Sequence, residues 1–420
     1  MSAAVRILLA IVVVVGVVAV IVLMSQDAGS PAADQSGSPV PSSAASKGLS
    51  PSSGPSEVAE VFSAIEADVV ELRELEPPDI GPAEIIDRDQ LARELEEMLA
   101  DEWTRDELFR SNLTLRAMGL LSADQDLREL TEQLLAGQVI GFYDPAEERM
   151  VVVSDEGLSV TARITYAHEY THALQDAAFD SFDTREELTD DDAILARQAL
   201  EEGDATFVMF QWALQHLTAE ELSDVAAQPV PDMTGIPEWM VAQLVFPYEQ
   251  GFAFVTSLRG SGGWAAVNDA YTDAPVSTEQ VIHPEKFAAG EDPLPVEAPA
   301  LADVFGRGWR DLEPTTMGEA MIDIWLTHLG LDDTAAAAAA AGWGGDRLVV
   351  ATGLDEAWVM AWRLAWDSAA EADEFAAAYE GLQPGGEIRS ALLRPSATET
   401  VVVHASSTDV LAAAISRLGG

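Results

Sequence analysis

The sequence predicts an α+β fold, in which a mostly helical domain with a small sheet is followed by a small α+β unit. Through most of residues 58–298, apolar residues recur at three- and four-residue steps, the period of an amphipathic helix. The exception is 139–153, where two apolar, β-branched runs flank a turn. From residue 299 onward, helix-like and strand-like stretches follow one another.

Composition limits the classes of partner. The chain has 420 residues, enough for two or three domains, and a formal net charge of −50. Nucleic acid is excluded as a partner, because binding it depends on cationic contacts to phosphate. There is no cysteine, which excludes a disulfide framework and a cysteine-ligated zinc site. An acidic surface with few lysines suits a salty environment, and a codon bias toward arginine and aspartate explains the same composition.

The first predicted element is a membrane anchor within residues 1–24. Ile7–Met24 is an uncharged apolar run that would span about 27 Å as a helix, close to the thickness of a bilayer core. The run ends without a clear small-residue cleavage site, which favours an anchor over a signal peptide; a cleaved signal would make the protein secreted. Arg6 precedes the run, so we expect a single-pass protein whose remainder lies outside the cytoplasmic membrane.

Residues 25–57 are rich in Ser, Pro and Gly and predict a flexible linker.

In the section 58–138, apolar positions from Val58 to Leu72 predict a helix that ends before Pro77. Further helices are expected at Asp87–Ala100, Thr104–Met118 and Asp124–Leu135. This section carries no recognisable chemistry, so we interpret it as a packing domain.

A β-hairpin is expected at the start of the section 139–298. Val139–Tyr143 and Met150–Val153 are β-branched and apolar, and Asp144–Glu148 forms the turn between them. An edge strand of this hairpin could pair with an extended peptide. It could equally be ordinary sheet core, and the sequence leaves both interpretations open.

The central motif is His168-Glu169-Tyr170-Thr171-His172, an H-E-x-x-H. Residues four apart lie on one helix face, so His168 and His172 can aim ring nitrogens at one zinc ion. Glu169 can then act as general base toward a water that the metal acidifies. The alternative is a solvated helix face, but the mostly apolar neighbours indicate a buried helix, where unpaired polar side chains are costly.

A third ligand candidate lies on the next long helix, expected at Leu188–Leu217. Glu202 falls on its small and apolar face, whereas Glu201 falls beside Arg197 on a face that we expect to be solvated. Gly203 lowers helix propensity and would permit close approach of a neighbouring helix.

Together, the H-E-x-x-H and this acidic segment resemble the gluzincin (thermolysin-like) zinc metallopeptidases. The chain is most similar to a group of uncharacterised bacterial and archaeal metallopeptidases, anchored or secreted. Three further motifs carry this resemblance: Gly141–Asp144, Glu202–Ala205 and Ser277–Lys286. The resemblance implies a zincin-like catalytic domain, with zinc held by His168, His172 and Glu202 and with Glu169 as base. It also implies that Asp176 and Asp204, acidic positions near the site, accept the second ring N–H of a ligating histidine.

Two other side chains are candidates for the catalytic cleft. Tyr248 lies in a segment that looks like a buried helix start with Pro247 in the first turn, and it could donate a hydrogen bond to an oxyanion. Its alternative is a packed aromatic side chain. His283 follows a short turn opened by Ser277 and Gln280 and could stabilise the tetrahedral intermediate, or bond to backbone as a structural histidine.

The section 299–420 is expected to be a small α+β unit packed after the catalytic part. Helices are predicted at Thr316–Leu329, Ala335–Ala341, Glu371–Leu382 and Asp409–Leu418, and strands at Leu348–Thr352, Trp358–Asp367 and Val401–Ala405.

These observations predict a zinc metallopeptidase that hydrolyses peptide bonds of a peptide or protein substrate outside the membrane. The alternative is a non-catalytic zinc-binding surface scaffold, and a hydrolase of non-peptide bonds with the same metal chemistry stays open as a third interpretation.

Overall fold

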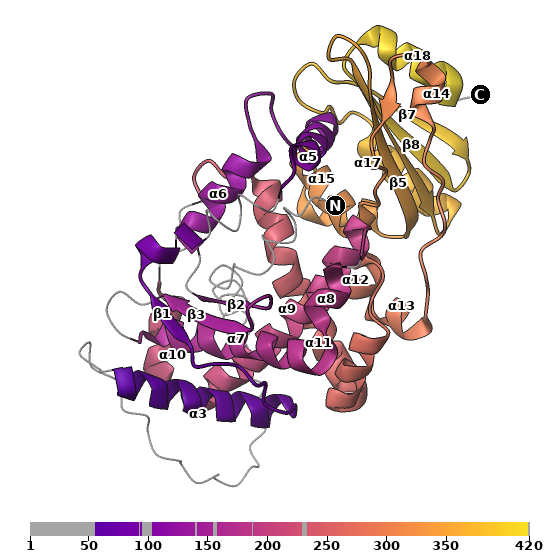
Figure 1. Cartoon of the computed structure of the whole chain (residues 1–420). Helices are drawn as coiled ribbons and strands as arrows, with labels where there is room; N and C mark the ends of the chain where they lie inside the picture. The colour runs from indigo at the N-terminus through magenta and orange to yellow at the C-terminus, as the bar shows by residue number, and fades with distance from the viewer. Residues whose placement is uncertain are drawn as a thin grey trace.

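The computed structural model describes residues 55–91, 93–94, 103–138, 141–153, 158–186, 188–228 and 233–418 (Figure 1). The predicted α+β fold is confirmed: helices surround a three-stranded sheet with the order β1-β3-β2 and a five-stranded sheet with the order β4-β5-β6-β8-β7. Figure 1 shows the two sheets at opposite ends of the molecule, with the long helices between and below them.

The small sheet contains the predicted hairpin. β2 (Gly141–Asp144) pairs antiparallel with β3 (Arg149–Val153), and β1 (Glu84–Ile86) pairs parallel with the other side of β3. β1 comes from the section expected to be only helical, so that section contributes directly to the sheet. Three residues are too short a run for a period-two pattern to reveal. At Gly141 a Cβ would lie 2.8 Å from the carbonyl oxygen of Val151, so this position has no room for a side chain.

Helices cover the small sheet and continue the chain. The predicted amino-terminal helices are present within a few residues of their expected ends, and only the first residues of the one expected at Asp87–Ala100 are described. The helices up to residue 272 are α3 (Pro55–Arg73), α5 (Arg105–Met118), α6 (Leu127–Gln138), α7 (Val160–Phe179), α8 (Ser181–Glu186), α9 (Asp191–His216), α10 (Ala219–Ala226) and α11 (Glu238–Thr272).

The helices α9 and α11 approach each other closely at two glycines. A Cβ on Gly203 would lie 2.2 Å from the carbonyl carbon of Gly251, so each helix needs a glycine there. The close approach expected at Gly203 is therefore confirmed. The expectation of a helix start at Pro247 is wrong, because this proline lies inside α11. The break in α11 comes later, at Gly262 and Gly263, whose backbone angles are not helical.

The carboxyl-terminal part is α+β, as predicted. Three short elements lead into it: α12 (Thr278–Ile282), α13 (Pro284–Ala289) and α14 (Leu301–Phe305). The remaining elements are β4 (Arg310–Asp311), α15 (Gly318–His328), α16 (Asp333–Ala340), β5 (Trp343–Thr352), β6 (Trp358–Trp366), α17 (Ala369–Tyr379), β7 (Arg389–Ser396), β8 (Glu399–Ala405) and α18 (Thr408–Leu418). The edge strand β7 was not predicted, because it is largely exposed and contains Pro395, which the edge of a sheet tolerates.

The carboxyl-terminal end of α5 connects this part to the rest of the chain. The last carbonyls of a helix have no partner within the helix. Here, consecutive carbonyl oxygens at the end of α5 accept hydrogen bonds from ring N–H groups of distant residues. The pairs are Ala117 with His404 at 2.6 Å, Met118 with Trp325 at 2.9 Å, Gly119 with His328 at 3.1 Å and Leu120 with Trp239 at 2.8 Å. Burial lowers the pKa of His404 to about 4, which keeps this ring neutral.

The prediction of a membrane-spanning helix is corrected. Among the residues that the structure describes, no helix is long and apolar enough to cross a bilayer. The two longest, α9 and α11, carry polar side chains along their length, including Glu202 and Glu249. The predicted segment Ile7–Met24 lies outside the described residues. Membrane attachment, the single-pass topology and the extracytoplasmic location inferred from it are therefore withdrawn.

Candidate metal centre

The helix α7 carries the H-E-x-x-H motif into the core. Ser159 caps its first turn, and its side chain accepts a hydrogen bond from the backbone N–H of Ala162 at 3.0 Å. Nearly every residue from Thr161 to Gln175 is buried. The side chains of His168 and His172 are only 0% and 6% exposed, so the solvated-face alternative does not apply.

The three predicted ligand atoms form a nearly equilateral triangle. His168 Nε2 lies 3.1 Å from Glu202 Oε2 and 3.1 Å from His172 Nε2, and the third edge, from His172 Nε2 to Glu202 Oε2, is 3.4 Å. Bonds of about 2.0–2.1 Å at tetrahedral angles separate neighbouring ligand atoms by about 3.3–3.4 Å. The triangle therefore fits the size of a tetrahedral metal site, and these three buried residues form a group that could hold a metal ion.

The charges of His172 and Glu202 stabilise each other at the triangle. Burial works to raise the pKa of Glu202, but the adjacent His172 outweighs it and holds that pKa at about 2. Burial also works to lower the pKa of His172, yet Glu202 raises it to about 9. At neutral pH the protonated His172 is therefore the positive partner of the ionised Glu202 carboxylate, and a metal ion would have to displace that proton.

A residue that the sequence interpretation missed orients one ligand. Gln175 Nε2 donates to the carbonyl oxygen of Glu201 at 3.0 Å, so its Oε1 faces His172 Nδ1 at 2.9 Å. That oxygen can only accept, hence Nδ1 of His172 carries a proton, and once the ring loses its second proton Nε2 presents a lone pair to the triangle. The signal was present in the sequence, because Gln175 follows His172 by three positions on one helix face.

The expected partners of the histidines contact other groups. Asp176 accepts a hydrogen bond from the Tyr143 hydroxyl at 2.9 Å. Asp204 is bonded to Arg73 Nε at 2.9 Å and to the Tyr271 hydroxyl at 3.0 Å. Neither carboxylate is hydrogen-bonded to a ligand histidine among the described residues, and Nδ1 of His168 has no partner there.

The adjacent Glu201 is buried, contrary to the expectation of a solvated side chain. Its carboxylate pairs with Arg185 of α8 at 2.5 Å and with Arg197 at 3.2 Å. Its backbone carbonyl anchors Gln175. Glu201 therefore supports the ligand helix and does not belong to the ligand triangle.

The carboxylate of Glu169 is held beside the triangle. Its Oε2 accepts a hydrogen bond from the backbone N–H of Tyr143, on β2, at 2.9 Å. Its Oε1 has no hydrogen-bond partner within the described part of the chain. Burial raises the pKa of Glu169 to about 8. The side chain is thus fixed through one oxygen and leaves the other available for a proton.

Of the two further candidates, only Tyr248 lies at the centre. Its buried ring stacks on that of His168, with ring centroids 6.0 Å apart, and burial followed by the charge of Glu202 raises its pKa. His283 instead pairs with the buried Glu319 of α15, at 3.0 Å. Because that pairing engages its ring with another helix, His283 makes no described contact with the metal ligands, and a role at the tetrahedral intermediate has no support.

Part of the chain matches a known family model. Residues 307–414, in the carboxyl-terminal part, match a family described as a domain of unknown function (DUF8575). No curated protein matches the chain, and no solved structure does.

Proposed function

We propose that the protein is a zinc-dependent peptidase in which His168, His172 and Glu202 hold the metal. The observation that carries the proposal is the triangle of ligand atoms, with edges of 3.1–3.4 Å. Two imidazoles and a carboxylate are a donor set that zinc accepts in catalytic sites. The resemblance of the H-E-x-x-H and Glu202 to the gluzincin pattern agrees with this assignment.

Glu169 is the proposed base. Zinc bound at the triangle supplies a Lewis acid that lowers the pKa of water to about 7. Glu169 would take the proton at Oε1, because Oε2 is already held by Tyr143 N–H at 2.9 Å. The same carboxyl group would then deliver the proton to the leaving amine. Tyr248, stacked on His168, is the proposed donor to the developing oxyanion.

A peptide substrate is supported by the strand next to Glu169. β2 lies at the edge of the described three-stranded sheet, and the N–H of Tyr143 points away from β3 toward Glu169. Alternate residues of an antiparallel strand face the same side, so the backbone of Gly141 also faces this edge. Because Glu169 already occupies the Tyr143 N–H and β2 is buried from Gly141 to Tyr143, an extended peptide would have to pair with the remaining edge groups of β2 to bring a backbone carbonyl close to the triangle.

The alternative is a scaffold that binds zinc without catalysis. Structural zinc sites are usually closed by four protein ligands. Among the described residues, the buried group that includes Glu202 offers three, which favours an open, catalytic site.

The test is hydrolysis of a quenched peptide by the wild type and by Glu169→Gln, at matched zinc content and high salt. Glu169→Gln should retain zinc and the fold but lose about 10²–10⁴-fold in rate, the usual cost of losing a general base. Equal rates in the two proteins would end the catalytic proposal. Absence of cleavage in both, with zinc retained, would favour the scaffold.

A further inference from the structure

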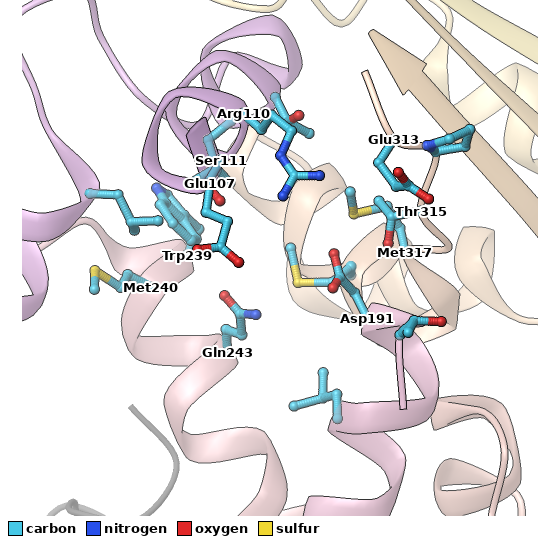
Figure 2. A pocket seen from close by; sticks show the side chains of 17 residues that line it. Glu107, Arg110, Ser111, Asp191, Trp239, Met240, Gln243, Glu313, Thr315 and Met317 are labelled. Atoms are coloured by element: carbon cyan, nitrogen blue, oxygen red, sulfur yellow. The ribbon is translucent and has the colours of Figure 1, made fainter. Parts of the chain in front are cut away.

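A cavity of about 150 Å³ lies where three parts of the chain meet. Its walls come from α5, from the first turns of α9 and α11, and from the segment that leads from β4 into α15 (Figure 2). Ligand pockets often form at such junctions and combine an apolar lining with a few convergent polar groups. The cavity has both features.

The cavity as a whole has room for about one side chain. Cavities of about 150 Å³ accommodate groups of about the size of benzene. The apolar lining is provided mainly by Leu115, Leu195, Trp239, Met240, Met317 and Met321. Methionine side chains adapt to ligands of different shape, so this surface favours a bulky apolar group without specifying one.

The polar side of the cavity presents a guanidinium with free hydrogen-bond donors. Arg110, Ser111 and Thr114 line the cavity from one side of α5, and Figure 2 shows the guanidinium of Arg110 extending from the helix into the space. Within the described residues, Arg110 makes no hydrogen bond or close ion pair, and it is partly buried. Hydrogen bonds from Thr104 and, after them, the charge of Arg110 lower the pKa of Glu107. A guanidinium with unused donors is suited to a carboxylate, which it can bind in a bidentate manner.

The acidic residues of the lining are less available to a ligand. Glu107 Oε2 accepts hydrogen bonds from the backbone N–H and the hydroxyl of Thr104, at 2.9 and 2.7 Å. The side chain of Asp191 is hydrogen-bonded to that of Thr315. Glu313 is exposed at the rim. The free hydrogen-bonding capacity inside the cavity therefore belongs mainly to Arg110 and the neutral groups Ser111, Thr114 and Gln243.

The helices that line the cavity also carry the metal centre. Leu195 lies seven positions before Glu202 on α9, and Gln243 lies five positions before Tyr248 on α11. At 1.5 Å per residue these separations are about 10 and 8 Å along the helix axes. An extended peptide spans about 3.3 Å per residue, so roughly three residues would bridge the distance.

We infer that this cavity binds the carboxyl-terminal residue of a peptide, with the free carboxylate on Arg110 and an apolar side chain among the methionines. The binding site stands on its own contacts. Its use as an anchor for substrate, with cleavage about three residues from the carboxyl end, rests on the proposed peptidase function.

Binding is measured on Glu169→Gln, which should not consume the peptide. The probes are a fluorescent hexapeptide ending in leucine with a free carboxylate and the same peptide as its carboxyl-terminal amide. The acid should bind about 10–100-fold more tightly, the usual effect of a charge-assisted hydrogen-bond pair. Arg110→Gln, added to this background, should abolish the preference, whereas Arg110→Lys should restore part of it.

Arg105→Gln is the matched control, because it removes the same charge from an exposed position on the same helix. It should leave the preference for the acid unchanged. Equal binding of acid and amide, a preference for the amide, or an unchanged preference in Arg110→Gln would each overturn the inference.

Cleavage by the wild type separates this inference from the proposed function. If both hold, cleavage sites should cluster about three residues from the carboxyl end, and Arg110→Gln should raise KM for the acid more than it lowers kcat. If no peptide is cleaved but the acid still binds through Arg110, the binding site stands and the peptidase fails. If cleavage depends neither on the carboxyl end nor on Arg110, the cavity does not anchor the substrate, and only the peptidase proposal stands.

Discussion

Two clusters in the described residues each bring three possible metal ligands within 4.8 Å of one another, and they differ in what holds their charge. The first is the ligand triangle of His168, His172 and Glu202, which is buried throughout. The second is an acidic cluster of Glu279, Glu291 and Asp367, of which only Glu279 is buried.

The acidic cluster is already neutralised by a lysine. Lys286 Nζ lies 2.7 Å from Glu279, 2.8 Å from Glu291 and 2.6 Å from Asp367. In the ligand triangle, the described ion pairs of Glu202 are with the two histidines alone. Proximity of carboxylates is thus a poor indicator of a metal site. The better indicator is the kind of cation beside the carboxylates: Lys286 stays charged, whereas a histidine that loses its proton becomes a metal ligand.

Removing one member of each cluster is the strongest test of this difference. Glu202→Ala should lower zinc affinity by more than about 100-fold, beyond the usual cost of changing a residue that only supports a ligand. Glu279→Ala should leave zinc binding unchanged. The measurement is zinc content after dialysis against a competing chelator. Full retention of zinc in Glu202→Ala would refute the ligand triangle.

The two clusters should also differ in pH dependence. Burial raises the pKa of Glu279 from its ordinary 4.5 to about 7, in spite of Lys286. An acid with a raised pKa holds its proton longer in the folded state, so its stabilising contribution is present below about pH 4.5 and is lost as the pH rises through 7. The loss is at most about 3 kcal/mol, at 1.36 kcal/mol per pKa unit.

The measurement is urea unfolding between pH 4.5 and 8, for the wild type and for Glu279→Gln. The amide cannot ionise, so Glu279→Gln should lose less stability over this range. Glu291→Gln, at an exposed position of the same cluster, is the control. Identical pH profiles for the wild type and Glu279→Gln would mean that Lys286 fully compensates the buried carboxylate.

The ligand triangle also differs in having a neighbouring side chain that orients one of its ligands. The ligand triangle has Gln175, which fixes the tautomer of His172 through a contact of 2.9 Å. Gln175→Ala should lower zinc affinity by about 10–100-fold. Gln175→Glu keeps an acceptor for the ring N–H and should recover much of the loss. Asp176→Asn, next in sequence but bonded to Tyr143, should have little effect on zinc affinity.

How far the sequence predicts this molecule depends on the range of the interaction. The long helices, the hairpin and the alternation after residue 299 follow from local periodicity and were correctly expected. Helical spacing separated Glu202 from Glu201, although the face expected to be solvated is buried and Glu201 pairs there with two arginines. Local patterns also indicated Gly203, whose missing side chain admits Gly251 of another helix.

Partners that are far apart in sequence could not be predicted. Asp204 is hydrogen-bonded to Arg73, which lies 131 positions away, and His283 is hydrogen-bonded to Glu319, 36 positions away. A sequence shows that a carboxylate and a histidine are close along the chain. It does not show which distant side chain binds that carboxylate in the folded protein. The same limit applies to β1, whose partner strand β3 belongs to another section.

The last comparison concerns the lysine of the acidic cluster. Lys286→Ala would remove the cation and leave the buried Glu279 without its hydrogen bond of 2.7 Å. An unsatisfied buried group costs about 1–3 kcal/mol. The negative charges of Glu291 and Asp367, which are more exposed, would in addition repel that of Glu279. The variant should therefore unfold at lower urea concentration than the wild type.

Calcium should then replace the lysine, because it accepts several carboxylate oxygens at about 2.3–2.6 Å in flexible geometry. Calcium at ten times its dissociation constant would restore about 1.4 kcal/mol of stability to Lys286→Ala and none to the wild type. The double variant Lys286→Ala with Glu279→Gln, which has lost the buried carboxylate, should respond less. The measurement is urea unfolding with and without calcium at constant ionic strength. If calcium stabilised the wild type as much as Lys286→Ala, the lysine would not be what distinguishes this cluster from the ligand triangle.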